Sequence, residues 1–140
     1  MTLAFIDTNI PMYAAGTPHG LREPSQWVIT GIVSGQIDAV TDVEVFQEIL
    51  YRYFRVRERE KGFSVFDSFR RIMLGRILPV EDVDIFRARQ LADRYPALSP
   101  RDLIHAAVAL HHHALDIITA DRGFDSVDGL RRLDPSLYSA

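Results

Sequence analysis

The sequence predicts an α/β fold in which helices cover both faces of a parallel sheet. Short apolar runs, typical of buried strands, alternate along the chain with longer amphipathic stretches, typical of helices. Strands that are separated in this way by helical crossovers pair in parallel. A chain of 140 residues is large enough for one well-buried core, so we expect a single domain over residues 1–140.

Four to five strands are expected. The first apolar run is continuous, which is the pattern of a strand buried on both faces. Pro79 predicts that the third strand lies at an edge of the sheet or ends early, because proline cannot donate a ladder hydrogen bond. The strand-like runs are residues 3–6, 39–41, 77–80, 116–119 and, more weakly, 130–133.

Helical stretches lie between these strands, at residues 23–34, 43–57, 65–73, 84–95 and 99–113. The second carries an apolar stripe at helical spacing, and Thr41 and Glu44 stand in the spacing of a capping box at its start. The charged run of residues 57–61 is interpreted as a solvated helix end that Gly62 breaks.

The composition excludes several classes of protein. Hydrophobic residues make up 47% and charged residues 25%, as in an ordinary globular protein, and the net charge of −3 provides no overall basic field for nucleic acid. The absence of cysteine excludes disulfides and thiolate metal sites. No apolar segment approaches the roughly 20 residues of a membrane span, and the first apolar run stops at Asp7, too early for a signal peptide. We therefore expect a cytoplasmic protein without membrane contact.

Four acidic residues occupy positions that this fold would bring together. Asp7 follows the first strand and Asp121 follows the fourth, and parallel sheets bind ligands at the carboxyl ends of their strands. Glu48 and Asp102 lie on helices expected beside them. Clustered carboxylates repel one another unless a cation neutralises them, and their oxygens suit Mg²⁺ or Mn²⁺. The sequence therefore indicates a metal-dependent active site.

Each of these acids also has a purely structural interpretation, which the sequence leaves open. Asp7 could cap the following helix. Asp102 could stabilise the first turn of the helix that begins after Ser99, because an acid there is favourable to the helix dipole. Asp121 could initiate the turn at residues 120–123. Glu48 flanks the apolar stripe of its helix and could be a solvated residue.

Segments in four parts of the chain resemble the PIN domain, and more narrowly the VapC-type toxins of bacterial and archaeal toxin–antitoxin pairs. They are residues 5–9 (FIDTN), the helix that carries Glu48, residues 99–107 (SPRDLIHAA) and residues 119–125 (TADRGFD). The resemblance runs over nearly the whole chain, in the order of the family. It implies a three-layer α/β/α fold with a central parallel sheet, and a Mg²⁺- or Mn²⁺-dependent endoribonuclease that leaves 5′-phosphate and 3′-hydroxyl ends. It also implies inhibition by a cognate antitoxin and a homodimer.

The resemblance assigns roles to particular positions. The family's acidic quartet matches Asp7, Glu48, Asp102 and Asp121. Asp125 matches a further acid that some members place near the metal, which makes it an additional candidate metal ligand. The polar residues Asn9 and Thr119 match supporting positions. We expect Asp7 and Asp121 to be metal ligands, with Glu48 and Asp102 as ligands or as holders of metal-bound water. Such a site activates water to hydrolyse a phosphodiester.

Three further features have structural interpretations beside functional ones. Asp42, where many family members carry a small polar residue, is interpreted as a helix cap. His105 follows Asp102 by three residues and is interpreted as a buried, hydrogen-bonded histidine, although it could assist the site. The tract of residues 111–113 is interpreted as a helix end, because consecutive residues point in different directions around a helix. A candidate RNA-contact patch on the second helix consists of Arg52, Arg55, Arg57 and Arg59.

Two other functions are less compatible with the sequence than a ribonuclease. A receiver-like or phosphoryl-transfer protein needs a lysine near the phosphate, and the only lysine, Lys61, lies in a charged helix end. A non-catalytic PIN-like module that binds RNA or protein should have lost an acid, yet all four positions are filled.

Overall fold

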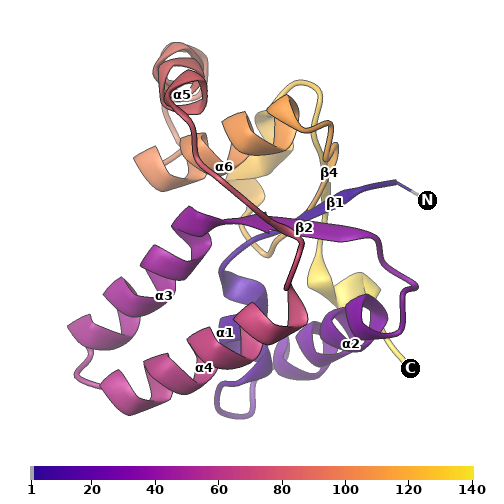
Figure 1. The fold of residues 1–140 in the computed structure, drawn as a ribbon. Helices are drawn as coiled ribbons and strands as arrows, with labels where there is room; N and C mark the ends of the chain where they lie inside the picture. Colours follow the sequence, from indigo (N-terminus) through magenta and orange to yellow (C-terminus); the bar gives the residue numbers. More distant parts are fainter. Residues whose placement is uncertain (1) are drawn as a thin grey trace.

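The computed structural model describes residues 2–140 and contains a five-stranded parallel sheet with the order β3-β2-β1-β4-β5 (Figure 1). The strands are β1 (Ala4–Ile6), β2 (Ala39–Asp42), β3 (Ile77–Leu78), β4 (Asp116–Ile118) and β5 (Arg131–Leu133). All five strand positions expected from the sequence are confirmed within one or two residues. In β1, Ala4 aligns with Ala39 of β2 on one side and with Asp116 of β4 on the other.

The central strands are short and buried on both faces. Phe5 and Ile6 of β1 and Ile117 and Ile118 of β4 are fully buried, as their continuous apolar runs predict. Burying one such side chain contributes about 1.5–3 kcal/mol. The edge position of β3 is also confirmed, because the strand has two residues and Pro79 follows it directly.

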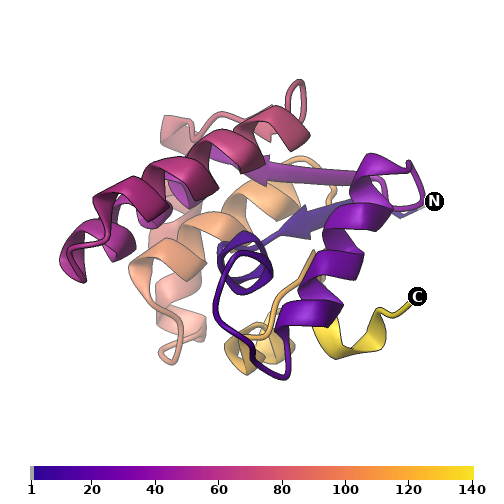
Figure 2. The ribbon, with the colours of Figure 1, turned by 90° about the horizontal axis from the view of Figure 1, so that it is seen from below.

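Helices cover both faces of the sheet, which gives the expected three layers (Figures 1 and 2). One face carries α5 and α6, and the other carries α1, α2 and α4, while α3 leaves the carboxyl end of β2 and packs on α4. The helices are α1 (Asn9–Ala14), α2 (Arg22–Val33), α3 (Val43–Arg55), α4 (Arg59–Ile72), α5 (Asp82–Arg94) and α6 (Pro100–His111). Two 3₁₀ helices, η1 (Arg122–Ser126) and η2 (Pro135–Leu137), flank β5.

The expected capping box at the start of α3 is wrong. Asp42 is the N-cap, and its Oδ1 accepts a hydrogen bond from Val45 N at 3.0 Å. Thr41 belongs to β2, where its hydroxyl donates to the Ile6 carbonyl at 2.9 Å. The interpretation of Asp42 as a cap is therefore confirmed, and the cap lies one residue later than the Thr41–Glu44 spacing predicts.

The connection between α3 and α4 also differs from the expectation. The chain turns at Arg57, which has a φ of 60°, and α4 begins at Arg59 and continues through Gly62. Gly62 therefore does not break a helix. A Cβ at Gly62 would lie 2.6 Å from the Tyr53 Cβ, so glycine is needed for the close approach of α4 to α3. As a consequence, Arg57 and Arg59 do not lie on the helix that bears Glu48.

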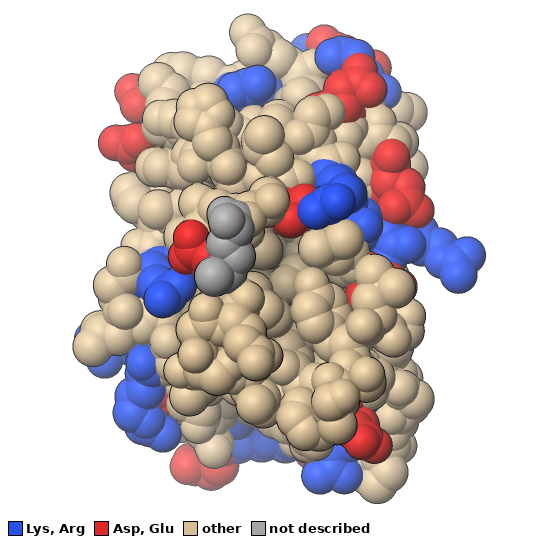
Figure 3. Space-filling view, turned by 90° about the vertical axis from the view of Figure 1, so that its right-hand side faces the viewer, with Lys and Arg blue, Asp and Glu red and all other residues tan. Residues whose placement is uncertain are grey.

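The end of the sheet where both chain termini lie is shown in Figure 3. Acidic and basic side chains lie next to one another at the margins of this face and in a band across its middle, with uncharged side chains between them. Within residues 2–140, no helix is both long and apolar enough to cross a membrane. The carboxyl ends of the strands lie at the opposite end, where the acidic residues gather.

Candidate metal centre

The four predicted acids come from four different elements at the carboxyl edge of the sheet. Asp7 directly follows β1, and Asp121 is the N-cap of η1, just after β4. Glu48 lies in the middle of α3, and Asp102 lies in the first turn of α6. The sheet order places β1 between β2 and β4, so the loop that carries Asp7 lies at the centre of this edge.

Asp7 is held in one orientation by donors from two loops. Its Oδ1 accepts from Thr8 N at 2.7 Å, and its Oδ2 accepts from the Thr119 hydroxyl at 2.7 Å and from Asn9 Nδ2 at 3.3 Å. Burial raises the pKa of Asp7, against the lowering effects of His105 and of these hydrogen bonds. The carboxylate is therefore fixed in place and short of compensating positive charge.

Asn9 and Thr119 join the loop after β1 to the loop after β4. Asn9 Nδ2 donates to Thr119 Oγ1 at 2.9 Å, and its Oδ1 accepts from Ala120 N at 3.3 Å. The same Thr119 hydroxyl oxygen accepts from Asp121 N at 3.0 Å. Both supporting residues expected from the sequence therefore lie at the site, where they fix Asp7 and Asp121 relative to each other.

Glu48 is buried at the rim of the α3 stripe rather than solvated, with 7% of its surface exposed. Its Oε1 accepts from the Thr8 hydroxyl at 2.8 Å, and its Oε2 pairs with Arg52 Nε at 3.1 Å. Burial favours the neutral acid, but the nearby positive charge of His105 and the Thr8 hydrogen bond outweigh it and lower the pKa of Glu48. Glu48 is therefore an ionised and well-anchored carboxylate.

Asp102 and Asp121 face each other. Burial raises the pKa of Asp102 to about 7, and the carboxylates of Asp7 and Asp121 add to this effect. The structural roles considered for both residues are also present: Ser99 caps α6 by accepting from Asp102 N at 3.2 Å, and Asp121 Oδ1 accepts from Gly123 N at 2.8 Å. These contacts use the backbone of Asp102 and only one oxygen of Asp121, so they do not compete with a ligand.

A buried pair of Asp42 and His105 lies beneath the acids. His105 is fully buried, and its Nδ1 lies 2.8 Å from Asp42 Oδ2. Its Nε2 lies 3.6 Å from Glu48 Oε1 and 3.9 Å from Asp7 Oδ1, and it has no hydrogen-bond partner within residues 2–140. Burial opposes a charge on this ring, but the carboxylates of Asp42, Glu48 and Asp7 prevail and hold the pKa of His105 well above its usual range.

Sequence reasoning identified the burial and hydrogen bonding of His105 but not its place in the site. The spacing of Asp102 and His105 puts both on one face of α6 and was the available signal. The partner Asp42 lies 63 positions earlier in the chain, so spacing could not reveal the contact. The imidazolium supplies one positive charge to a group of acids that carries several negative charges.

The donor atoms of Asp7, Asp102 and His105 lie within 4.8 Å of one another. A protonated His105 cannot act as a ligand, so the carboxylates of Asp7 and Asp102, with Asp121 beside them, are the oxygens available to a cation. This donor set fits a hard divalent ion. The sequence predicts Asp7 and Asp121 as the metal ligands. In the structure, the acids whose donor atoms lie within 4.8 Å of each other are Asp7 and Asp102. Asp125 is exposed, and its Oδ1 pairs with Arg132 Nε at 2.7 Å.

The chain matches one family model and several known proteins. The PIN domain family model matches residues 4–130. The chain is 39% identical to VapC ribonuclease Mb1869c of Mycobacterium bovis over 94% of this chain and 99% of that protein, and 36% identical to ribonuclease VapC23 of Mycobacterium tuberculosis over 85% and 93%. Among solved structures, VapBC2 of Rickettsia felis bound to a promoter DNA fragment superposes with a TM-score of 0.70 at 19% identity, over 94% of this chain and 98% of that one. FitAcB of Neisseria gonorrhoeae gives 0.70 at 19% identity, over 94% and 97%.

Proposed function

This chain belongs to the PIN domain family, among the VapC ribonucleases, and from this premise we propose that it cleaves RNA with a divalent cation held by Asp7, Asp102 and Asp121. The observation that carries the proposal is the approach of donor atoms of Asp7 and Asp102 within 4.8 Å of each other, with Asp7 buried and Asp102 half-buried. Burial, together with the neighbouring carboxylates of Asp7 and Asp121, raises the pKa of Asp102 to about 7, and a bound cation would offset the repulsion between these carboxylates. Mg²⁺ or Mn²⁺ is the proposed ion, since the available ligands are carboxylate oxygens.

Hydrogen bonds within the chain hold Asp7 and Glu48 in the orientations that the proposed reaction needs. Bound Mg²⁺ or Mn²⁺ supplies Lewis-acid chemistry, by which water is activated and the charge that develops on the phosphate is stabilised. Asp7 is oriented by donors from Thr8, Thr119 and Asn9 and needs no rearrangement to act as a ligand. Glu48 is anchored by Thr8 and Arg52, which suits it to hold a water molecule by accepting a hydrogen bond from it.

Asp125 contributes less to the proposed site than the four quartet acids do. Its carboxylate is paired with Arg132, which also donates to the Thr119 carbonyl at 3.1 Å and to Asp134 at 2.9 Å. Asp125 therefore supports the loop that carries Thr119 and Asp121 from a position at the surface. We expect its loss to affect the site less than the loss of any quartet acid.

Arginines beside the site are the proposed contacts for the RNA backbone. Arg52, Arg55 and Arg101 line one groove together with Tyr51 and Met12. The Arg101 guanidinium lies 4.2 Å from the centre of the Tyr51 ring, and its Nε lies 3.6 Å from Glu44 Oε1. Arginine forks suit phosphate oxygens, and an aromatic ring offers a base a stacking surface. Arg57 and Arg59 lie beyond the end of α3 and are left out of this contact.

The partners follow from the same family. We propose a cognate antitoxin protein as the regulatory partner, supported by the curated VapC relatives and by structural neighbours such as the toxin–antitoxin complex from Klebsiella pneumoniae, with a TM-score of 0.63. A homodimer remains part of the proposal on the basis of the family resemblance alone. A cytoplasmic location is proposed because the substrate is RNA.

The proposal is tested by RNA cleavage with the intact chain in Mn²⁺, before and after chelation with EDTA. Asp7→Asn should lower the cleavage rate at least about 100-fold, because a metal contributes several kcal/mol to the transition state. Asp128→Asn is the matched control, since its exposed carboxylate pairs with Arg94 away from the acids. Cleavage that survives both EDTA and Asp7→Asn would overturn the assignment. Binding of RNA or antitoxin without cleavage in wild type would favour a non-catalytic PIN-like module instead.

A further inference from the structure

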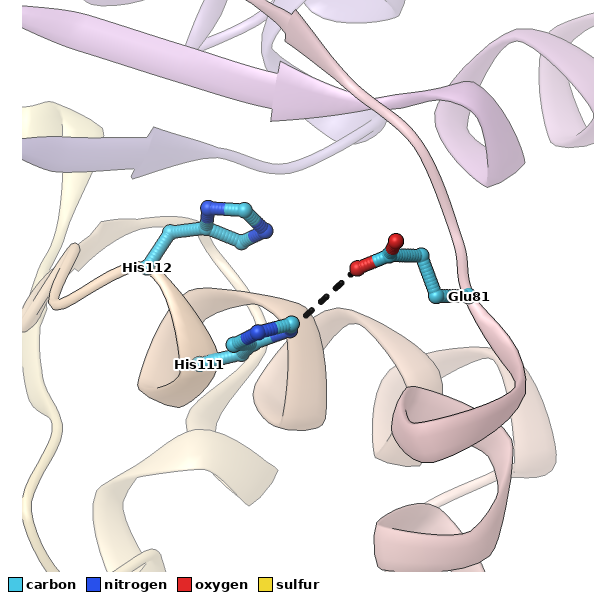
Figure 4. A group of neighbouring side chains, drawn as sticks. All are labelled: Glu81, His111 and His112. Atoms are coloured by element: carbon cyan, nitrogen blue, oxygen red, sulfur yellow. Dashed lines mark ion pairs between the residues drawn. The ribbon is translucent and has the colours of Figure 1, made fainter.

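A second group of ligand-type side chains lies at the far end of α6. Glu81 precedes α5, His111 is the last residue of α6, and His112 follows it. One donor atom from each lies within 4.8 Å of the others, and Figure 4 shows the three side chains converging from two segments. Asp102 and His111 are nine residues apart on α6, which separates this group from the acidic site by about 14 Å along the axis.

The two neighbouring histidines point the same way because the helix ends between them. Consecutive residues inside a helix diverge, and the sequence therefore predicts that the imidazoles of this tract separate. That prediction is wrong for His111 and His112, whose ring centres lie 4.4 Å apart at an interplanar angle of 39°. His112 is the C-cap of α6, and His113 turns the chain away with a φ of 56°.

A buried carboxylate orients the first of these rings. Asp84 is 1% exposed, and its Oδ1 lies 2.8 Å from His111 Nδ1. The other oxygen of Asp84 accepts from Glu81 N at 2.9 Å, so one side chain fixes both the ring and the segment opposite it. The same Nδ1 lies 4.0 Å from Glu81 Oε2, so this edge of the ring faces both carboxylates. A neutral histidine whose Nδ1 donates to a carboxylate keeps Nε2 as the nitrogen that can bind a metal.

His112 supplies an independent observation. Its Nε2 is shielded from solvent and has no hydrogen-bond partner among the residues that the structure describes. Figure 4 shows this ring directed toward Glu81 and away from the backbone of α6. A shielded nitrogen without a partner is costly, and a bound ion or an ordered water satisfies it.

We propose that Glu81, His111 and His112 bind a borderline transition-metal ion such as Zn²⁺, with water completing the coordination. Two imidazoles and one carboxylate are a donor set for Zn²⁺, whereas the all-oxygen set of Asp7, Asp102 and Asp121 suits Mg²⁺ or Mn²⁺. The chain thus carries two sites of opposite metal preference. The second site joins the segment before α5 to the end of α6 and takes no part in RNA cleavage.

The test uses Co²⁺ as a visible probe for the Zn²⁺ site, on the intact chain in excess Mg²⁺ so that the acidic site is occupied. We expect d–d absorption bands of low-coordinate Co²⁺ that saturate at one equivalent and disappear on addition of Zn²⁺. Single variants Glu81→Gln, His111→Ala and His112→Ala should each lower the Co²⁺ affinity at least about tenfold. Asp84→Asn should lower it roughly 10- to 100-fold, because it removes the group that orients His111.

The matched control is His113→Asn, which removes an adjacent imidazole that is not part of the group and keeps a residue tolerant of positive φ. This variant should bind Co²⁺ like wild type. Circular dichroism in EDTA identifies any variant that fails to fold, and the remaining variants then decide. Co²⁺ bands that are missing in wild type, or that are equal in wild type and His112→Ala, would overturn the proposal. RNA cleavage by His112→Ala should match wild type, so failure of this site and failure of the ribonuclease are separate results.

Discussion

Asp102 is an acid whose protonation the site changes strongly. Its pKa is raised to about 7 in the folded protein, from an ordinary value of 3.8, by burial and by the carboxylates of Asp7 and Asp121. The folded chain therefore binds this proton more tightly than the unfolded chain does. The stability that the proton provides is complete below about pH 4 and is lost as the pH rises through about 7.

Asp102→Asn should therefore stabilise the metal-free protein at high pH only. At pH 8 the wild type carries the charge repulsion that the amide removes, so the variant should have the higher melting temperature in EDTA. At pH 4 the two should be nearly equal, because Asp102 is protonated there in the folded state. Thermal unfolding at both pH values measures the difference. A stabilisation that is the same at pH 4 and pH 8 would contradict the raised pKa.

Asp42 combines a helix cap with a buried charge partner, and the two roles can be separated. Asp42→Ser keeps an oxygen for Val45 N but removes the partner of His105 Nδ1. Breaking one side of a buried pair costs about 3–5 kcal/mol, whereas losing a cap alone costs about 1 kcal/mol. We expect Asp42→Ser to lower the free energy of unfolding by the larger amount, measured by urea denaturation at pH 7. A loss near 1 kcal/mol or less would show that His105 does not depend on Asp42.

At the level of elements, the packing of α4 on α3 depends on one missing side chain. A Cβ at Gly62 would meet the Tyr53 Cβ at 2.6 Å, and neither atom can move without a backbone shift. Gly62→Ala should destabilise the protein by about 1–3 kcal/mol, despite the higher helix propensity of alanine. Gly20→Ala is the control, since a Cβ there has no described atom within 4 Å. Equal unfolding free energies for the two variants would contradict the close approach of the helices.

The strands and the long helices could be predicted because their signals are local. The run Leu3 to Ile6 is apolar at every position, and the α3 stripe repeats at helical spacing. The short helix α1 was missed because its six residues are too few to show a period, and two of them, Asn9 and Pro11, favour turns. Gly62 was expected to break a helix end, whereas it lies inside α4. The sequence could not show this, because only the position of Tyr53 in space explains the glycine.

The candidate site was predictable in part for the same reason. Asp7 and Asp121 follow apolar runs, and a parallel sheet brings the ends of such runs to one edge. The contacts that fix them are not local: Thr119 donates to Asp7 from 112 positions away, and Asp42 meets His105 across 63. The sequence indicates which residues could gather at the edge, and folding decides which atoms touch.

For the whole molecule, a cation bound by the acidic residues should stabilise the folded chain. An ion that binds only the folded state adds about 2.7 kcal/mol at a concentration 100-fold above its dissociation constant. We expect Mn²⁺ to raise the melting temperature of wild type at pH 8, where Asp102 is ionised, and to have much less effect on Asp7→Asn. Because Mn²⁺ prefers oxygen ligands, His112→Ala should respond like wild type. A shift that is equal in wild type and Asp7→Asn would place the ion elsewhere.

The most direct test of the central claim is the anomalous scattering of Mn²⁺ in crystals of the intact chain. We expect an anomalous peak within ligand distance of the Asp7 and Asp102 carboxylates, with Asp121 beside it, and no such peak in crystals of Asp7→Asn. A fully occupied Mn²⁺ peak elsewhere, with the Asp7 and Asp102 carboxylates bonded only to protein and water, would contradict it.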